Sequence, residues 1–129
     1  MKTTLLAALT LCAALWTISS CNKNKNQEDI KIEILSPADG AVFNSGDTLA
    51  LKVTASDNDD LHEMKLEIRQ GANIALGLYP YVHAIKSYTI DTLIVIPPVS
   101  GTQIYSLEAA AEDHESHTAE DIISITVNP

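Results

Sequence analysis

The fold of this 129-residue chain is decided by the stretch Ser36–Asp57, which reads SPADGAVFNSGDTLALKVTASD. It opens with two turn signals, Ser36–Gly40 and Asn44–Asp47. Apolar and polar residues then alternate, and the apolar ones are Leu49, Leu51, Val53 and Ala55. A period of two is typical of a β-strand with one buried face. We therefore expect a half-buried strand to follow the second turn.

The same period of two returns along the rest of the chain. We expect strands at 30–34, 49–55, 64–68, 74–81, 88–96, 105–111 and 123–127. Turn residues separate these segments, and no segment shows a sustained helical period. Seven short strands with turns between them predict an all-β domain, a β-sandwich of about seven antiparallel strands that spans residues 30–129.

Three motifs resemble those of bacterial immunoglobulin-like domains. The Ser36–Asp57 stretch is similar to their opening, which runs P-x-x-G-x-x-F-x-x-G-D into the second strand. ASDNDDLHEMKLEI, from Ala55, looks like their second loop and third strand, and GTQIYSL, from Gly101, looks like the start of their sixth. The resemblance covers about residues 30–128 and implies an immunoglobulin-like β-sandwich. It also implies that the Tyr105 hydroxyl hydrogen-bonds the preceding loop near Gly101.

The N-terminus has the features of a secretion signal that ends at a lipid attachment site. Lys2 supplies a positive charge, and the apolar stretch 5–18 has the length of a signal peptide and is too short to span a membrane. Ile18-Ser19-Ser20-Cys21 then resembles a bacterial lipobox, in which the cysteine is acylated and becomes the mature N-terminus. Ile18 and Ser20 depart from the usual Leu and Gly or Ala of that motif.

These features divide the chain into three parts. Residues 1–20 are the expected lipoprotein signal peptide, residues 21–29 the lipidated cysteine and flexible tether, and the remainder the domain. Asn22 follows the cysteine where aspartate would, in many Gram-negative bacteria, retain a lipoprotein at the inner membrane. We therefore expect a lipid-anchored protein of the bacterial cell envelope, located at the outer membrane. Length, lipobox and single domain resemble a family of short, uncharacterised bacterial lipoproteins.

The charge of the mature chain limits its partners. Cleavage before Cys21 would leave 109 residues with seven basic and seventeen acidic side chains, a net charge of −10. Such a surface repels phosphate backbones, so we expect no nucleic acid among its partners. It also repels anionic lipid headgroups, so the acyl chains at Cys21 would carry the membrane attachment.

All four histidines are expected at one end of the sandwich. If successive strands alternate in direction, the loops at 57–61, 82–87 and 113–119 share one rim. The candidate metal ligands on this rim are His62, His83, Asp113, His114 and His117. Imidazole and carboxylate suit zinc or copper, whereas Asp57, Asp59 and Asp60 could instead offer oxygen ligands to calcium. The alternative is a solvated polar rim, and no cofactor is required for the fold.

Other chemistry is less well represented in the sequence. No nucleophile lies in a glycine-flanked strained turn and no phosphate-binding glycine loop is present, so we expect no enzyme. Tyr79, Tyr81 and Tyr88 could form a surface for a glycan or a protein, or could simply cover a sheet. We therefore expect a non-catalytic envelope module that engages a protein partner, with metal binding and glycan binding as alternatives.

Overall fold

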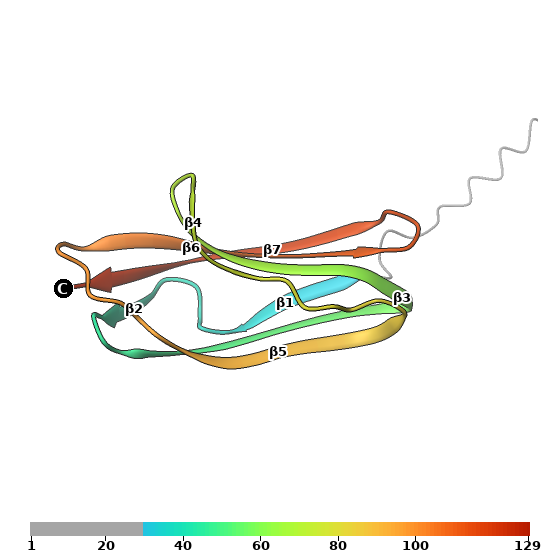
Figure 1. Cartoon of the computed structure of the whole chain (residues 1–129), viewed down its shortest axis with the longest axis horizontal. Coiled ribbons are helices and arrows are strands. Elements are labelled where there is room, and N and C mark those ends of the chain that lie inside the picture. Colours follow the sequence, from blue (N-terminus) through green and yellow to red (C-terminus); the bar gives the residue numbers. More distant parts are fainter. Residues whose placement is uncertain (1–29) are drawn as a thin grey trace, which may run out of the picture.

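The computed structural model describes residues 30–129, which form seven β-strands (Figure 1). The strands are β1 (Lys31–Ser36), β2 (Ala41–Asn44), β3 (Thr48–Gln70), β4 (Asn73–Leu78), β5 (Ile85–Val95), β6 (Gln103–Asp113) and β7 (Thr118–Asn128). No helix capable of crossing a membrane occurs in this part of the chain. The expected signal peptide, the lipidated Cys21 and the tether lie outside the described residues.

The long strand β3 belongs to both layers of the sandwich. Its first half pairs antiparallel with β1 and β5, and its second half pairs antiparallel with β4 and β6. β7 then joins β6, and the short β2 joins β7 in the one parallel pair among the described strands. Figure 1 shows β3 turning from one layer into the other at one end of the molecule. The expected all-β sandwich is confirmed.

Two of the expected elements differ in detail. The segment 57–61, expected as a loop, continues β3 because Leu61 is fully buried and the Lys86 ammonium donates to the carbonyl of Asn58 at 2.6 Å. β4 ends at Leu78, earlier than expected, because Pro80 has no backbone N–H to donate to a ladder.

The core lies between the two layers. It is formed mainly by apolar side chains at alternate positions of the strands, which point inward. The largest fully buried side chains are Leu49, Leu51, Leu61, Met64, Leu66, Leu107, Val53, Val82 and Val127. Burial of one such leucine contributes about 1.5–3 kcal/mol to folding. The inward faces that the sequence predicts for β3, β6 and β7 are therefore the faces that pack against one another.

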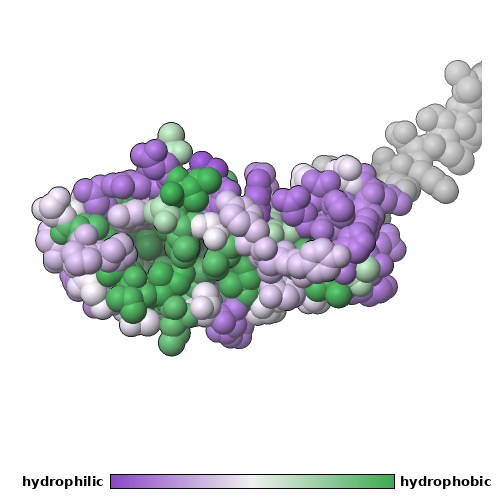
Figure 2. All heavy atoms as spheres, viewed as in Figure 1, coloured by the Kyte–Doolittle hydropathy of each residue, from purple (hydrophilic) through white to green (hydrophobic). Residues whose placement is uncertain are grey.

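The two lateral sides of the sandwich differ. On the side of β1 and β7, the Ile34 N–H donates to Asp121 Oδ2 at 2.7 Å and the Ser124 N–H donates to Asp39 Oδ1 at 2.8 Å. These bonds tie the layers together. On the side of β4 and β5 the layers part around a groove of about 310 Å³. Its lining is mainly apolar, and Figure 2 shows apolar side chains around a hollow on this face.

The tyrosine-corner expectation for Tyr105 is wrong. Within residues 30–129, no hydrogen bond joins its hydroxyl to Gly101 or to the rest of the preceding loop. The half-buried Tyr105 ring instead lines the apolar groove together with Leu49 and Ile68. The parting of the layers leaves room for the ring there, so it contributes apolar surface at the edge of the core.

Candidate functional site

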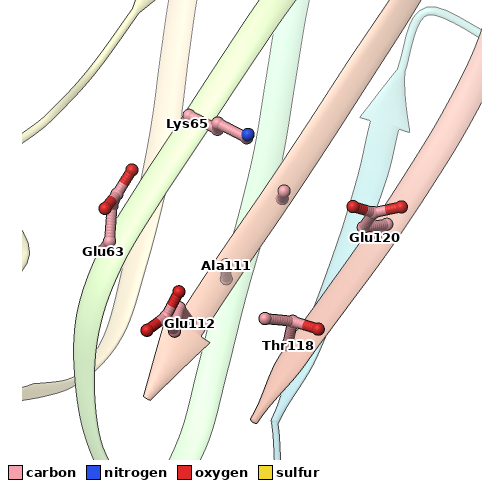
Figure 3. Close-up of a pocket in the computed structure, with 7 residues that line it drawn as sticks. Glu63, Lys65, Ala111, Glu112, Thr118 and Glu120 are labelled. Atoms are coloured by element: carbon pink, nitrogen blue, oxygen red, sulfur yellow. The ribbon is translucent and has the colours of Figure 1, made fainter. Parts of the chain in front are cut away.

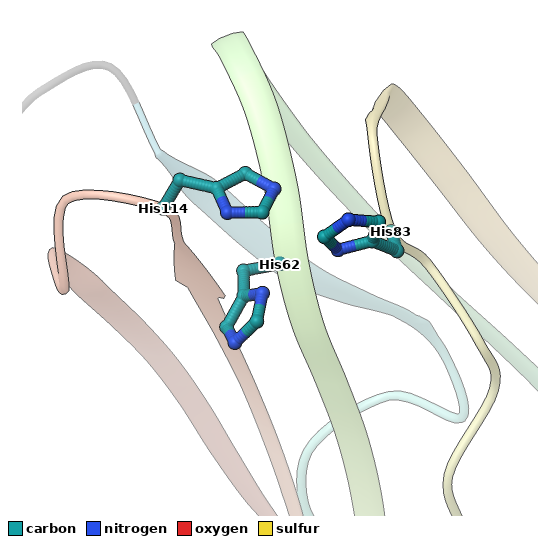
Figure 4. A group of neighbouring side chains, drawn as sticks. All are labelled: His62, His83 and His114. Atoms are coloured by element: carbon teal, nitrogen blue, oxygen red, sulfur yellow. The ribbon is translucent and has the colours of Figure 1, made fainter.

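Three histidines converge at the end of the sandwich where β3 turns between the layers (Figure 4). One ring nitrogen from each of His62, His83 and His114 lies within 4.8 Å of the other two. The ring centroid of His114 is 4.7 Å from those of both His62 and His83, which are 5.7 Å from each other. Among residues 30–129, this is the only group of three or more histidine, cysteine or acidic side chains that gathers in this way.

His62 is placed by a bulge in β3. Leu61 pairs with Asp113 and Glu63 pairs with Glu112, so His62 is an extra residue with no partner position on β6. A bulge changes the direction of its side chain and increases the local twist of the strand. Because Leu61 is anchored in the core, the bulge presents the His62 ring to solvent beside it.

His83 comes from the irregular segment between β4 and β5. The neighbouring Val82 is buried in the core, and the Ala84 N–H donates to the Leu61 carbonyl at 3.2 Å. Ala84 has a positive φ of 59°, which turns the chain sharply at this point. His83 is therefore held between a core anchor and a bond to the residue that precedes His62.

His114 begins the turn that joins β6 to β7. The turn is closed by two backbone bonds, from the Asp113 N–H to the His117 carbonyl at 3.1 Å and from the Ser116 N–H to the Asp113 carbonyl at 3.3 Å. Ser116 adopts a left-handed φ of 66°. The three candidate ligands are thus positioned by different features: His62 by a bulge, His83 by a hydrogen-bonded irregular segment and His114 by a tight turn.

Asp113 and His117, which the sequence placed among the ligands, pair with each other instead. Asp113 Oδ1 accepts from the N–H groups of Glu115 at 2.7 Å and His117 at 2.8 Å, and Asp113 Oδ2 lies 2.6 Å from His117 Nδ1. Burial would raise the pKa of Asp113, but the hydrogen bonds from the backbone and ring of His117 and from the backbone of Glu115 lower it below its ordinary value. The carboxylate is fully engaged within its turn.

The oxygen-ligand set considered for calcium is not assembled. Asp57, Asp59 and Asp60 form no group of three gathered ligand atoms in the described part of the chain. Asp57 is buried, and its Oδ1 accepts a hydrogen bond from the Asp59 N–H at 3.3 Å. This carboxylate therefore bonds the backbone of β3 where the strand bends.

The surface next to the cluster is acidic. Figure 3 shows Glu63, Glu112 and Glu120 on the outer face of β3, β6 and β7, around a shallow hollow of about 90 Å³ in which Lys65 is the only cation. Glu63 directly follows His62, and Glu112 lies opposite it on β6. A negative potential of this kind raises the local concentration of cations.

The cluster is compatible with a tetrahedral metal ion after a small adjustment. Zinc–nitrogen bonds of about 2.0–2.1 Å place tetrahedral ligand nitrogens about 3.4 Å apart. The ligand nitrogens lie within 4.8 Å of one another, so their separations exceed this bound distance by at most about 1.4 Å. All three side chains are exposed and can rotate to close this difference. Three imidazoles would leave one coordination position for water or another ligand.

The three tyrosines considered as a binding surface do not act as one group. Tyr79 and Tyr88 line an open groove of about 440 Å³, whereas the ring of Tyr81 has its centroid 6.0 Å from that of His83. The Tyr79 hydroxyl donates to Glu67 Oε1 at 2.7 Å, and its ring covers Gly77, where a Cβ would lie 2.6 Å from ring atoms. Tyr79 is therefore held in place by a partner that the sequence pattern did not reveal.

Seven strands in two layers around an apolar core define an immunoglobulin-like β-sandwich, a class whose members are typically non-catalytic surface or binding modules. Residues 31–127 match the family described as bacterial Ig domain, and the chain belongs to that family. A comparison with curated proteins finds no match.

The solved structures similar to this chain include an engineered protein and fibronectin(III)-like modules. An engineered protein of known crystal structure is 21% identical with a TM-score of 0.53, and the match covers 78% of this chain and 20% of that one. The fibronectin(III)-like modules of Clostridium thermocellum CbhA are 18% identical with a TM-score of 0.49, and the match covers 75% of this chain and 94% of that one. The present chain thus spans about a fifth of the engineered protein, and that likeness concerns the fold alone.

Proposed function

We propose that this protein is a metal-binding module of the bacterial cell envelope that holds a zinc or copper ion through His62, His83 and His114. The observation that carries the proposal is that three of the four histidines come from separate segments and meet at one point. Each is positioned by its own backbone feature, so the convergence belongs to the fold. Imidazole nitrogen is a preferred ligand of both metals.

The proposal places the metal site close to a membrane. Lys31, the first residue of β1, pairs with Ser56, immediately before the bend of β3, so the described chain begins at the histidine end. If Cys21 carries the lipid, the eight residues 22–29 reach at most about 26–29 Å when fully extended. The histidine cluster would then face the outer membrane from the end of a short tether, held there by two or more acyl chains.

Thermal melting with added metal tests the proposal. A ligand that binds only the folded state stabilises it by about 2.7 kcal/mol at a hundredfold excess over the dissociation constant. We expect zinc and copper, but not calcium, to raise the melting temperature of the parent. We expect His62→Ala, His83→Ala and His114→Ala to reduce that shift. Asp59→Asn, which removes a charge from the same rim and no imidazole, should retain it, and equal shifts in all variants would contradict the proposal.

A protein partner is a second candidate, favoured by the open side of the sandwich. Within the described residues, β4 and β5 each pair only with β3, so both have a free edge beside the apolar groove. Leu93 and Val95 on β5 are 71% and 69% exposed. An extended segment of another envelope protein could add to β5 as a strand and insert alternate apolar side chains into the groove.

Site-specific photo-cross-linking in cells tests this second candidate. A cross-linker at position 93 should give a defined product that one at position 120, on the outer face of the other layer, does not give. A Val95→Pro change removes a backbone N–H from the free edge of β5, because the N–H of the next residue, Ile96, is the one that donates toward β3, to the Asp47 carbonyl. This change should abolish the product while the domain remains folded. Equal products from both positions would contradict strand addition.

A further inference from the structure

We infer that Asp113 is the positioning residue of the three-histidine site: its carboxylate fixes the turn that presents His114 and keeps His117 out of the ligand set. This inference rests on the proposed metal binding. It assigns to Asp113 and His117 a role different from the direct coordination that their position on the rim suggested.

The first step concerns the turn itself. Asp113 is 6% exposed, and its carboxylate accepts two backbone N–H bonds from residues 115 and 117 of the turn. Its own backbone makes both of the bonds that close the turn. A single residue therefore holds the backbone on both sides of His114. Without its carboxylate, the N–H groups of Glu115 and His117 lose the acceptor that they share.

The second step concerns the place of His114 in the cluster. Its ring lies equally close to the other two rings, with centroid separations of 4.7 Å, whereas His62 and His83 are 5.7 Å apart. His114 is thus the neighbour that the other two histidines share. A displaced turn would disturb two of the three ring pairs and leave only the widest one.

The third step concerns His117. Its Nδ1 lies 2.6 Å from Asp113 Oδ2, and its side chain is 31% exposed. The contact with Asp113 occupies one ring nitrogen and directs the ring toward the turn. Outer partners that hold a metal site in place typically change metal affinity by about 10- to 100-fold when they are removed.

Zinc titration calorimetry on the purified protein tests the inference. Asp113→Ala should weaken zinc binding about tenfold or more. Asp113→Asn should retain most of the affinity, because an amide oxygen can still accept both backbone bonds. Leu107→Ala provides the control, since this substitution in the distant core lowers stability and should leave the zinc affinity of the folded protein unchanged.

His117 provides an independent pair of variants should Asp113→Ala fail to fold. His117→Ala should weaken zinc binding. In His117→Gln the side-chain amide can still donate to Asp113 but cannot replace imidazole as a ligand, so this variant should bind zinc with nearly the affinity of the parent. Equal loss in both variants would make His117 a ligand and overturn the inference. Unchanged affinity in Asp113→Ala or His117→Ala would also overturn it, while leaving the metal proposal intact. Absence of zinc binding by the parent would instead reject the metal proposal itself.

Discussion

The rings of His62 and His114 lie with their centroids 4.7 Å apart, although one belongs to β3 and the other follows β6. The residues that precede them, Leu61 and Asp113, occupy paired positions on these two antiparallel strands. The register of the β3–β6 pair therefore determines whether the two imidazoles meet. A slip of one residue would reverse the faces of the strand and separate them.

The core predicts the largest stability effects. Leu66 and Leu107 are both buried on the inward faces of the neighbouring strands β3 and β6, where Leu66 pairs with Ala109 and Leu107 with Ile68. Truncation of either to alanine should cost about 2–5 kcal/mol of unfolding free energy, measured by urea denaturation. Leu93→Ala, at a side chain that is 71% exposed, is the matched control and should cost less than about 0.5 kcal/mol. Similar costs at all three positions would show that the assigned inward faces are wrong.

The bond between Asp121 and Ile34 predicts a second stability effect. Asp121→Ala removes the acceptor of the Ile34 N–H and leaves that group without its partner between the layers. We expect a loss of about 1–3 kcal/mol in the free energy of unfolding. Glu120→Ala alters the neighbouring exposed side chain and should have little effect. If the two variants unfold at the same urea concentration, this bond does not hold β1 to β7.

The Glu67–Tyr79 pair predicts a pH dependence. The hydrogen bond from Tyr79, and then that from Arg69, lower the pKa of Glu67 below its ordinary value of 4.5. A carboxyl whose folded-state pKa is lowered stabilises the fold above its unfolded-state pKa, and this contribution is lost as the pH falls through the folded-state value. Tyr79→Phe should therefore reduce the difference in stability between neutral pH and pH values below 4.5. An unaltered pH dependence of urea unfolding would argue against this role of the hydroxyl.

Lipidation is predicted at Cys21. Cells that express the protein and are fed an alkyne fatty acid should incorporate the label into it, because the lipobox-like sequence ends at this cysteine. Cys21→Ala should remove both the label and the membrane attachment, whereas Cys12→Ala, within the expected signal peptide, should leave the mature label in place. A label that persists in Cys21→Ala would contradict the predicted anchor.

The strand pattern made much of the fold and of the histidine rim predictable. Alternation identifies the inward faces, and the alternating direction of successive strands brings His62, His83 and His114 to the same end. The run Ser56–Asp60 has the composition of a turn, yet β3 continues through it because Ala55 and Leu61 are both buried on either side. Tertiary pairing overrides local propensity there. The four-residue β2 was missed, since so short a segment shows no period.

The exact ligand set was less predictable. The sequence placed both His114 and His117 among the candidate ligands, but the carboxylate of Asp113 contacts the His117 ring within the same turn. The bulge at His62 depends on how β3 and β6 align, which no local pattern reveals. Sequence reasoning could therefore place the histidines at one end and could not separate ligands from supporting residues.

The central claim is tested most directly by proton–nitrogen NMR spectra of the four imidazole rings, recorded before and after the addition of one equivalent of zinc. Each ring nitrogen reports its own protonation, hydrogen bonding and metal coordination. We predict that one nitrogen of each of His62, His83 and His114 shifts on zinc addition, while His117 keeps the signature of its bond to Asp113. Spectra in which no imidazole responds, or in which His117 shifts in place of one of the other three, would contradict the account.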